Sequence, residues 1–200
     1  MTDFLIATNN AHKVEEFKRI LLPLGINVLS AKDAGVDLGD VEENGSTFAE
    51  NAKIKAMSAY NISGMPSIAD DSGLCVDALD GAPGIYSARY GGEDIPQSER
   101  TALLLKNLEG KEGSERSAHF VCSICCVFSP DDIVEVEGFC HGTIATETLG
   151  CGGFGYDPVF IYEDGRSFGE IDANEKDSVS HRGVALRQLK TKLIARKDEK

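Results

Sequence analysis

Residues 68–92 read IADDSGLCVDALDGAPGIYSARYGG. Two neighbouring carboxylates, Asp70 and Asp71, follow a short apolar run and precede a serine, a glycine and a second apolar run. Because Asp, Ser and Gly are common turn residues, this order predicts a strand, a sharp acidic turn and another strand. Adjacent carboxylates repel each other unless a positive charge lies beside them, and Mg²⁺ with oxygen ligands is the natural candidate. Taken alone, however, the stretch favours an ordinary acidic surface turn.

The composition is typical of a soluble globular protein, with 42% apolar and 26% charged residues in a chain of 200. This length suits one domain. No apolar run approaches the ~20 residues that a membrane span needs, and the N-terminus lacks the pattern of a signal peptide. We therefore expect a cytoplasmic protein that does not associate with membranes.

The net charge of −13 bears on the choice of ligand. Acidic residues outnumber basic ones in both halves of the chain, so the sequence offers no patch that could neutralise a nucleic-acid backbone. A small anionic ligand is still compatible with this charge, because it needs only a few well-placed cations.

The cysteines also exclude one class of site. Cys122 and Cys125 have the spacing of a metal or redox pair, but they lie inside the apolar run FVCSICCVF with no second pair nearby. This setting favours buried, reduced thiols that pack as small hydrophobes.

The chain opens with a strand, a helix and a second strand. An apolar run at 4–7 precedes TNNAHK (8–13), a helical period of apolar residues follows, and residues 26–29 form the next strand. The polar segment 8–13 therefore lies between a strand and a helix N-terminus, where open α/β sheets bind ligands and phosphate is favoured. A helix capped by asparagine, with an incidental Lys13, explains the segment equally well.

A second helix begins near residue 47, where Thr47 to Glu50 fit a capping box. Lys53 and Lys55 are two residues apart and cannot share a helix face, so we expect one to face a ligand or an acid and the other to face water. Glu43 lies just before this helix, where it could meet a metal-held phosphate, although a single loop glutamate is usually solvated.

The second half of the chain contains a long β-hairpin, a glycine-rich loop and a basic cluster. In the loop GCGGFGYDP (150–158), glycines let the backbone approach a ligand and an aromatic ring can stack on a base; the alternative is that the aromatics pack into the core. The spacing fits neither a Walker A loop nor a dinucleotide fingerprint. Lys176, His181 and Arg182 surround the N-terminus of the last helix, which they oppose electrostatically unless an anion is present.

Taken together, these segments closely resemble the inosine triphosphate pyrophosphatase family. The resemblance covers almost the whole chain in the family's order, and the family often has glycine at the position of Asn9. The matching stretches are TNNAHK (8–13), ENGSTFAENAKIKA (43–56), IADDSGLCVDALDGAPGIYSARYGG (68–92), GGFGYDPVF (152–160) and EKDSVSHRG (175–183).

The resemblance implies an elongated α/β fold, with a mixed twisted β-sheet, flanking helices and two lobes around a central cleft. Residues 1–200 would form a single bilobed domain, usually as a homodimer. The implied activity is Mg²⁺-dependent hydrolysis of ITP, dITP or XTP to the nucleoside monophosphate and pyrophosphate.

The resemblance also implies roles for individual residues. Glu43 and Asp71 would bind Mg²⁺, with Asp70 supporting them or acting as a further ligand, and Asp71 would accept a proton from the attacking water. Thr8, Asn10 and Lys13 would hold phosphates with Lys55 nearby, whereas the loop 154–157 would receive the base. The implied substrate-binding residues are Thr8, Asn9, Asn10, Lys13, Lys55, Ser72, Phe154, Gly155, Tyr156, Asp157, Lys176, His181 and Arg182.

Two other classes of function remain open from the sequence. One is a hydrolase for modified pyrimidine triphosphates, which would prefer dUTP or dTTP to ITP. The other is a nucleotide-binding module without catalysis, which the acidic pair argues against because clustered carboxylates do not help a protein to bind phosphate.

Overall fold

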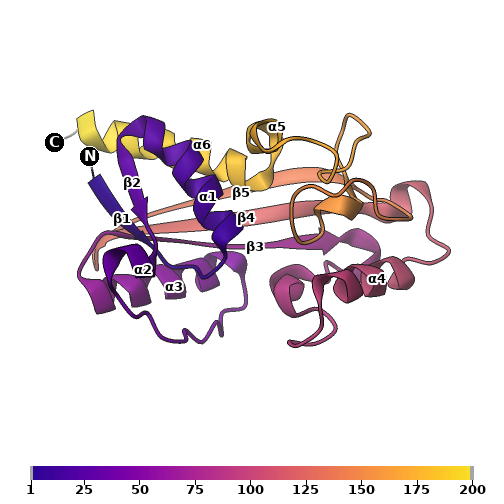
Figure 1. Cartoon of the computed structure of the whole chain (residues 1–200), viewed down its shortest axis with the longest axis horizontal. Helices are drawn as coiled ribbons and strands as arrows, with labels where there is room; N and C mark the ends of the chain where they lie inside the picture. The colour runs from indigo at the N-terminus through magenta and orange to yellow at the C-terminus, as the bar shows by residue number, and fades with distance from the viewer. Residues whose placement is uncertain (1, 199–200) are drawn as a thin grey trace. The chain divides into compact units, whose positions relative to one another are not determined.

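The computed structural model describes residues 2–198 (Figure 1). The strands are β1 (Thr2–Ile6), β2 (Ile26–Leu29), β3 (Ser67–Val76), β4 (Ser117–Ser129), β5 (Asp132–Ile144) and β6 (Phe160–Ile161). The α-helices are α1 (Ala11–Leu21), α2 (Ala31–Ala34), α3 (Phe48–Ser63), α4 (Gln97–Asn107), α5 (Ala173–Val179) and α6 (His181–Asp198). Short 3₁₀ helices lie at Leu22–Leu24, Asp77–Leu79, Gly84–Arg89, Gly113–Arg116 and Asp157–Val159.

Within residues 2–198 the strands form one mixed sheet in the order β2-β1-β3-β4-β5-β6. β1 pairs in parallel with both β2 and β3, and β6 is antiparallel to β5. The predicted mixed α/β fold with flanking helices is confirmed, as are the opening strand, helix and strand. The sequence patterns did not reveal α2 or α5.

The predicted acidic turn at Asp70 and Asp71 is wrong, because β3 runs without interruption from Ser67 to Val76. β1 pairs with β3 only as far as Ile6 opposite Ile68. The chain then leaves β1 for the loop before α1, while β3 continues into the two carboxylates. Both acids therefore lie in a strand, just beyond the end of its parallel neighbour β1.

The chain divides into two compact units, and the division falls within β3, β4 and β5. One unit comprises Met1–Asp71, Cys122–Gly138 and Arg182–Lys200, and the other comprises Ser72–Val121 and Phe139–His181. Each unit has its own hydrophobic core. The cleft between two lobes and the single bilobed domain, which the resemblance implies, stay predictions.

In the first unit, helices cover the sheet on both faces. On one face, Phe17 of α1 and Leu186 of α6 pack in a cluster with Ile6 and Ile68. On the other face, Ala52 and neighbouring alanines of α3 pack with Leu5, Ala7 and Ala69. Because successive residues of a strand point to opposite faces, Asp70 continues the α1 and α6 face and Asp71 continues the α3 face.

Two further expectations can be compared with the structure. Cys122, Cys125 and Cys126 are buried and free, and burial raises the pKa of the Cys125 thiol to about 12, which confirms the interpretation of inert packing thiols. In the described part of the chain, no helix has both the length and the apolar character to cross a membrane.

Candidate functional site

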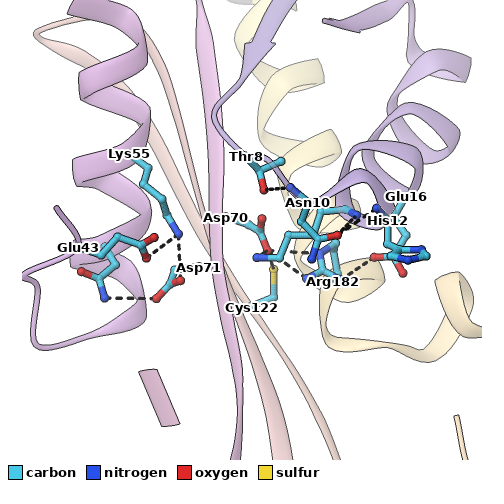
Figure 2. A network of polar contacts seen from close by, with 12 residues as sticks. Thr8, Asn10, His12, Glu16, Glu43, Lys55, Asp70, Asp71, Cys122 and Arg182 are labelled. Carbon is cyan, nitrogen blue, oxygen red and sulfur yellow. Dashed lines mark hydrogen bonds and ion pairs between the residues drawn. The ribbon is translucent and has the colours of Figure 1, made fainter. Parts of the chain in front are cut away.

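The two neighbouring acids of β3 face opposite sides of the strand (Figure 2). Asp71 points toward Lys55 and Glu43 beside α3, whereas Asp70 points toward Arg182 and the first turns of α1. The alternation of side chains along a strand thus separates two carboxylates that are adjacent in the sequence. The residues around Asp71 form one cluster and those around Asp70 form another, and both clusters belong to the first unit.

On the Asp71 side, two carboxylates meet one ammonium group. Lys55 Nζ lies 3.0 Å from Asp71 Oδ1 and 2.9 Å from Glu43 Oε2. The side chains of Lys55 and Asp71 are only 13% and 11% exposed. Of the two lysines that the sequence placed on different faces of α3, Lys55 is therefore the one that meets acids, and Lys53 is exposed and lies 3.8 Å from Glu135.

Asn51 also belongs to this cluster, although the sequence analysis did not identify it. Its Nδ2 donates to Asp71 Oδ2 at 3.4 Å, and its Oδ1 accepts from the backbone N–H of Gly45 at 2.8 Å. A Cβ at Gly45 would lie 2.6 Å from that Oδ1, so glycine permits this contact. A signal was present in the sequence, because Asn51 precedes Lys55 by one helical turn and shares its face.

On the Asp70 side, one carboxylate oxygen meets two cations. Asp70 Oδ2 lies 2.9 Å from Lys13 Nζ, accepts from Arg182 Nε at 3.3 Å and Nη2 at 3.1 Å, and lies 3.8 Å from Cys122 Sγ. Asp70 and Arg182 are 1% and 2% exposed. Lys13 is thus part of a buried ion cluster and is not an incidental surface lysine.

Glu16 also belongs to the Asp70 cluster, and no sequence pattern pointed to it. Its Oε2 accepts from Arg182 Nη1 at 2.5 Å, and the residue is 7% exposed. Glu16 follows Lys13 by three residues on α1, which is the spacing of helix neighbours. Its partner Arg182, however, is 166 residues away in the sequence, so the ion pair could not be anticipated.

The two clusters shift the pKa values of their acids in opposite directions. For Asp70, burial favours the neutral form, but Lys13 and Arg182 outweigh it and hold the pKa well below its ordinary value. For Asp71, burial is the larger effect and raises the pKa, although Lys55 opposes it. The pKa of Lys55 is raised, because Asp71, Asp70 and Glu43 together outweigh its burial.

The loop before α1 caps that helix. Asn10 Oδ1 accepts from the backbone N–H groups of His12 and Lys13, and Thr8 Oγ1 accepts from the N–H of Asn10 at 3.2 Å. The helix is therefore capped by asparagine, as one of the two open interpretations held. Asn9, which lies between Thr8 and Asn10, is exposed.

In the second unit, the glycine-rich loop is held by an internal ion pair. Asp157 Oδ2 lies 2.6 Å from Lys176 Nζ and accepts from the N–H of Phe154 at 2.7 Å. The Lys176 ammonium lies 4.5 Å from the centre of the Phe154 ring, at a distance typical of a cation–π contact. Gly153 has a φ of +70°, and a Cβ there would lie 2.2 Å from Asp157 Oδ2, so this loop requires glycine.

The other sequence-predicted residues of the second unit are placed differently. Tyr156 is buried, and its hydroxyl donates to the carbonyl of Ser87 at 3.0 Å; its ring packs in the core, as the alternative interpretation held. Gly155 faces open space at its Cα. His181 stacks on Phe120 with ring centres 4.6 Å apart, and Ser72 is half-buried in β3.

The donor set beside α3 fits a magnesium ion. Mg²⁺ is usually held by one or two carboxylates together with waters and substrate phosphates, and Asp71 and Glu43 present two such groups to one point. The ammonium group of Lys55 contacts both carboxylates, so a positive charge is accommodated between them. Among the described residues, no group of three or more His, Cys, Asp or Glu side chains could hold a metal ion.

Comparison with known proteins gives one consistent result. The family model described as the Ham1 family matches residues 4–192. The dITP/XTP pyrophosphatase of Clostridium perfringens is 46% identical, over 96% of this chain and 98% of that protein. The structure of the HAM1 protein from Coxiella burnetii matches with a TM-score of 0.88 and 40% identity, covering 98% of this chain and 100% of that one. The Staphylococcus aureus Ham1 protein matches with a TM-score of 0.86 and 37% identity, over 98% and 100% of the two chains. Since both the family model and these relatives span nearly its whole length, the chain belongs to the Ham1 family.

Proposed function

We propose that the protein hydrolyses the non-standard purine nucleoside triphosphates ITP, dITP and XTP to the nucleoside monophosphate and pyrophosphate, and so removes them from the nucleotide pool. The observation that carries this proposal is the separation of Asp70 and Asp71 onto opposite faces of β3. One face offers a pair of carboxylates for a metal, and the other offers cations for phosphates. Relatives named dITP/XTP pyrophosphatase support the choice of substrate.

The reaction breaks the bond between the α-phosphorus and the oxygen that bridges it to the β-phosphorus. A water oxygen attacks the α-phosphorus, and pyrophosphate leaves with the bridging oxygen. Phosphoryl transfer requires positioning and charge neutralisation more than covalent catalysis. Such a site needs a base to take the proton of the water and fixed cations around the phosphates.

Asp71 is the base in this proposal. In the metal-free protein, burial raises its pKa, and a positioned carboxylate can accept a proton from the attacking water. Glu43 and Asp71 would hold Mg²⁺, whose charge would offset that of the phosphates and lower the pKa of a bound water. Asn51 fixes the Asp71 carboxylate from the other side by its hydrogen bond to Oδ2.

Lys13 and Lys55 bind phosphate oxygens in this proposal, with the loop at Thr8, Asn9 and Asn10 shaping the approach to Lys13. Asp70 does not bind the metal. It holds the side chains of Lys13 and Arg182 in place, and Glu16 balances the charge of Arg182.

The base is recognised by the second unit in this proposal. The ring of Phe154 offers a stacking surface, and Lys176 and Asp157 fix the loop that carries it. Ser72, Gly155 and His181 are further proposed contacts. A pocket that accepts hydrogen or oxygen at the purine 2-position, but leaves a 2-amino group without a partner, would reject guanine.

We further propose that the enzyme works as a homodimer in the cytoplasm, with neither nucleic acid nor a membrane as a partner. Light scattering coupled to gel filtration would measure the molar mass of the purified protein. A mass of one chain at micromolar concentration would contradict the dimer.

The activity itself is tested by product analysis. The wild-type protein is incubated with ITP and Mg²⁺, and the products are separated by ion-exchange chromatography. We expect inosine monophosphate and pyrophosphate, and much slower turnover of GTP and ATP. Diphosphate plus inorganic phosphate would contradict the proposed bond cleavage, and faster hydrolysis of dUTP or dTTP than of ITP would contradict the proposed substrate class.

A further inference from the structure

The ammonium group of Lys55 contacts the two carboxylates, Glu43 and Asp71, that would hold a metal ion. Lys55 Nζ lies 2.9 Å from Glu43 Oε2 and 3.0 Å from Asp71 Oδ1, so the two oxygens that would bind a cation already share one. We propose that Lys55 takes the place of the metal between Glu43 and Asp71 in the free protein and moves to a substrate phosphate when the metal binds. The inference rests on the proposed function, because it assigns Glu43 and Asp71 to the metal.

The charges of the cluster support this exchange. Glu43 and Asp71 carry two negative charges and Lys55 carries one positive charge, which leaves one negative charge where the side chains of Asp71 and Lys55 are 11% and 13% exposed and that of Glu43 is 32% exposed. A divalent ion added beside an unmoved Lys55 would reverse that to one positive charge. Two cations in such a place repel each other strongly, and a triphosphate would relieve the repulsion.

The Asp71 carboxylate has a second partner besides Lys55. Asn51 Nδ2 donates to Asp71 Oδ2, and Asn51 Oδ1 is itself held by the backbone N–H of Gly45. Asn51 is 1% exposed and lies on the same helix as Lys55. If the lysine charge is removed, Asp71 therefore keeps a partner, and its carboxylate stays close to the position that a metal requires.

The consequence is that metal and triphosphate bind cooperatively. A metal alone must displace Lys55, whereas a metal that arrives with phosphate gives Lys55 a new anionic partner. Because Lys55 acts through the metal ligands in the free protein, it is a positioning residue there. A purely structural lysine, in contrast, would hold Glu43 and Asp71 together, and its removal would weaken metal binding.

The test compares Lys55→Met with Lys53→Met, its matched control on the same helix, which is half-exposed and faces Glu135. Mn²⁺ binding to each full-length protein is measured by electron paramagnetic resonance without nucleotide. Removing a like charge at this distance changes the affinity for a cation by about tenfold or more. We expect Lys55→Met to bind Mn²⁺ at least about tenfold more tightly than the wild type, and Lys53→Met to match the wild type.

The measurement is repeated at matched free Mn²⁺ with an α,β-methylene analogue of ITP. We expect the analogue to tighten Mn²⁺ binding to the wild type more than to Lys55→Met, because the variant has no lysine to displace. Lys55→Arg keeps the charge and should bind Mn²⁺ as the wild type does. Lys55→Gln removes the charge and should bind Mn²⁺ more tightly than the wild type; it replaces Lys55→Met if the methionine variant does not fold.

Folded Lys55→Met and Lys55→Gln variants that bind Mn²⁺ no more tightly than the wild type would overturn the inference. That outcome is separate from failure of the proposed function, which product analysis of the wild-type protein with ITP decides. If the wild type releases pyrophosphate from ITP while the neutral variants show no gain in Mn²⁺ affinity, only the role of Lys55 in the free protein is excluded.

Discussion

The two faces of β3 in the first unit carry the same chemical group in opposite surroundings. On the α1 and α6 face, the formal charges of Asp70, Glu16, Lys13 and Arg182 balance, and the pKa of Asp70 is lowered. On the α3 face, Glu43 and Asp71 share the single positive charge of Lys55, and the pKa of Asp71 is raised. An acid whose charge is balanced by neighbouring cations is suited to a structural role, whereas an acid with excess negative charge beside it is suited to a metal and a proton.

The largest expected effect is on catalysis at the α3 face. Asp71→Asn should lower kcat for ITP by about a thousandfold, because a general base contributes about 10²–10⁴-fold and a metal ligand is lost as well. Steady-state kinetics with a pyrophosphate readout measures the change, and circular dichroism verifies the fold. Near-normal turnover in a folded variant would remove Asp71 from the role of base.

The next effect is on stability at the opposite face. Asp70→Asn leaves Lys13 and Arg182 without their shared carboxylate, and removing one partner of a buried ion pair costs about 3–5 kcal/mol. Urea unfolding in metal-free buffer measures the free energy of unfolding. Asp71→Asn should change the free energy of unfolding much less, because burial already disfavours the charged form of Asp71 in the wild type. An equal loss of stability in both variants would contradict the difference between the two faces of β3.

A smaller effect is expected on substrate affinity. Lys13→Ala should raise KM for ITP about tenfold or more, since a hydrogen bond to a charged group contributes about 1.5–3 kcal/mol. Lys18→Ala is the control on the same helix, because Lys18 is half-buried and its Nζ lies 3.5 Å from Asp33 Oδ2, away from the Asp70 cluster. If both variants keep the KM and kcat of the wild type, Lys13 does not hold phosphate.

The smallest expected effect is a difference in pH dependence. A lowered folded-state pKa means that the stabilisation from Asp70 is complete above its unfolded value of about 3.9 and is lost as the pH falls through the folded value. The raised pKa of Asp71 gives the opposite sign: its contribution is present below the unfolded pKa and is lost as the pH rises through the folded pKa. In metal-free buffer, the stability difference between wild type and Asp70→Asn should therefore shrink below about pH 4.

The stability difference between wild type and Asp71→Asn should move in favour of the variant as the pH rises above about 4. Urea unfolding at a series of pH values measures both differences. The same sign of pH dependence in both variants would contradict the opposite pKa shifts.

Local patterns were sufficient for much of the fold. The opening strand, helix and strand, the capped helix at Thr47 and the long hairpin all follow from apolar periodicity and capping residues. The prediction of a turn failed at Asp70 and Asp71 because turn propensity is a local property. The charges of these two residues are instead offset by basic side chains that are distant in the sequence. Arg182 is 112 residues from Asp70 in the sequence, and no local pattern could reveal that it would neutralise the charge.

The candidate site was predictable where the family motifs cover it and not elsewhere. Glu43, Lys55 and Asp71 do lie together, but no sequence pattern indicated that Asp70 would face away from them. Asn51 could have been found from its helical spacing to Lys55. Glu16 could not, because a glutamate on an amphipathic helix is ordinarily solvated and its ion pair depends on tertiary structure.

Mn²⁺ binding to Asp70→Asn and Asp71→Asn, measured by electron paramagnetic resonance with the α,β-methylene analogue of ITP present, tests the division between the two acids most directly. We expect folded Asp71→Asn to lose the protein-dependent Mn²⁺ site, and folded Asp70→Asn to keep it with weaker binding of the analogue. Retention of the site in Asp71→Asn, or its loss in a folded Asp70→Asn variant, would contradict the assignment of the metal to the α3 face.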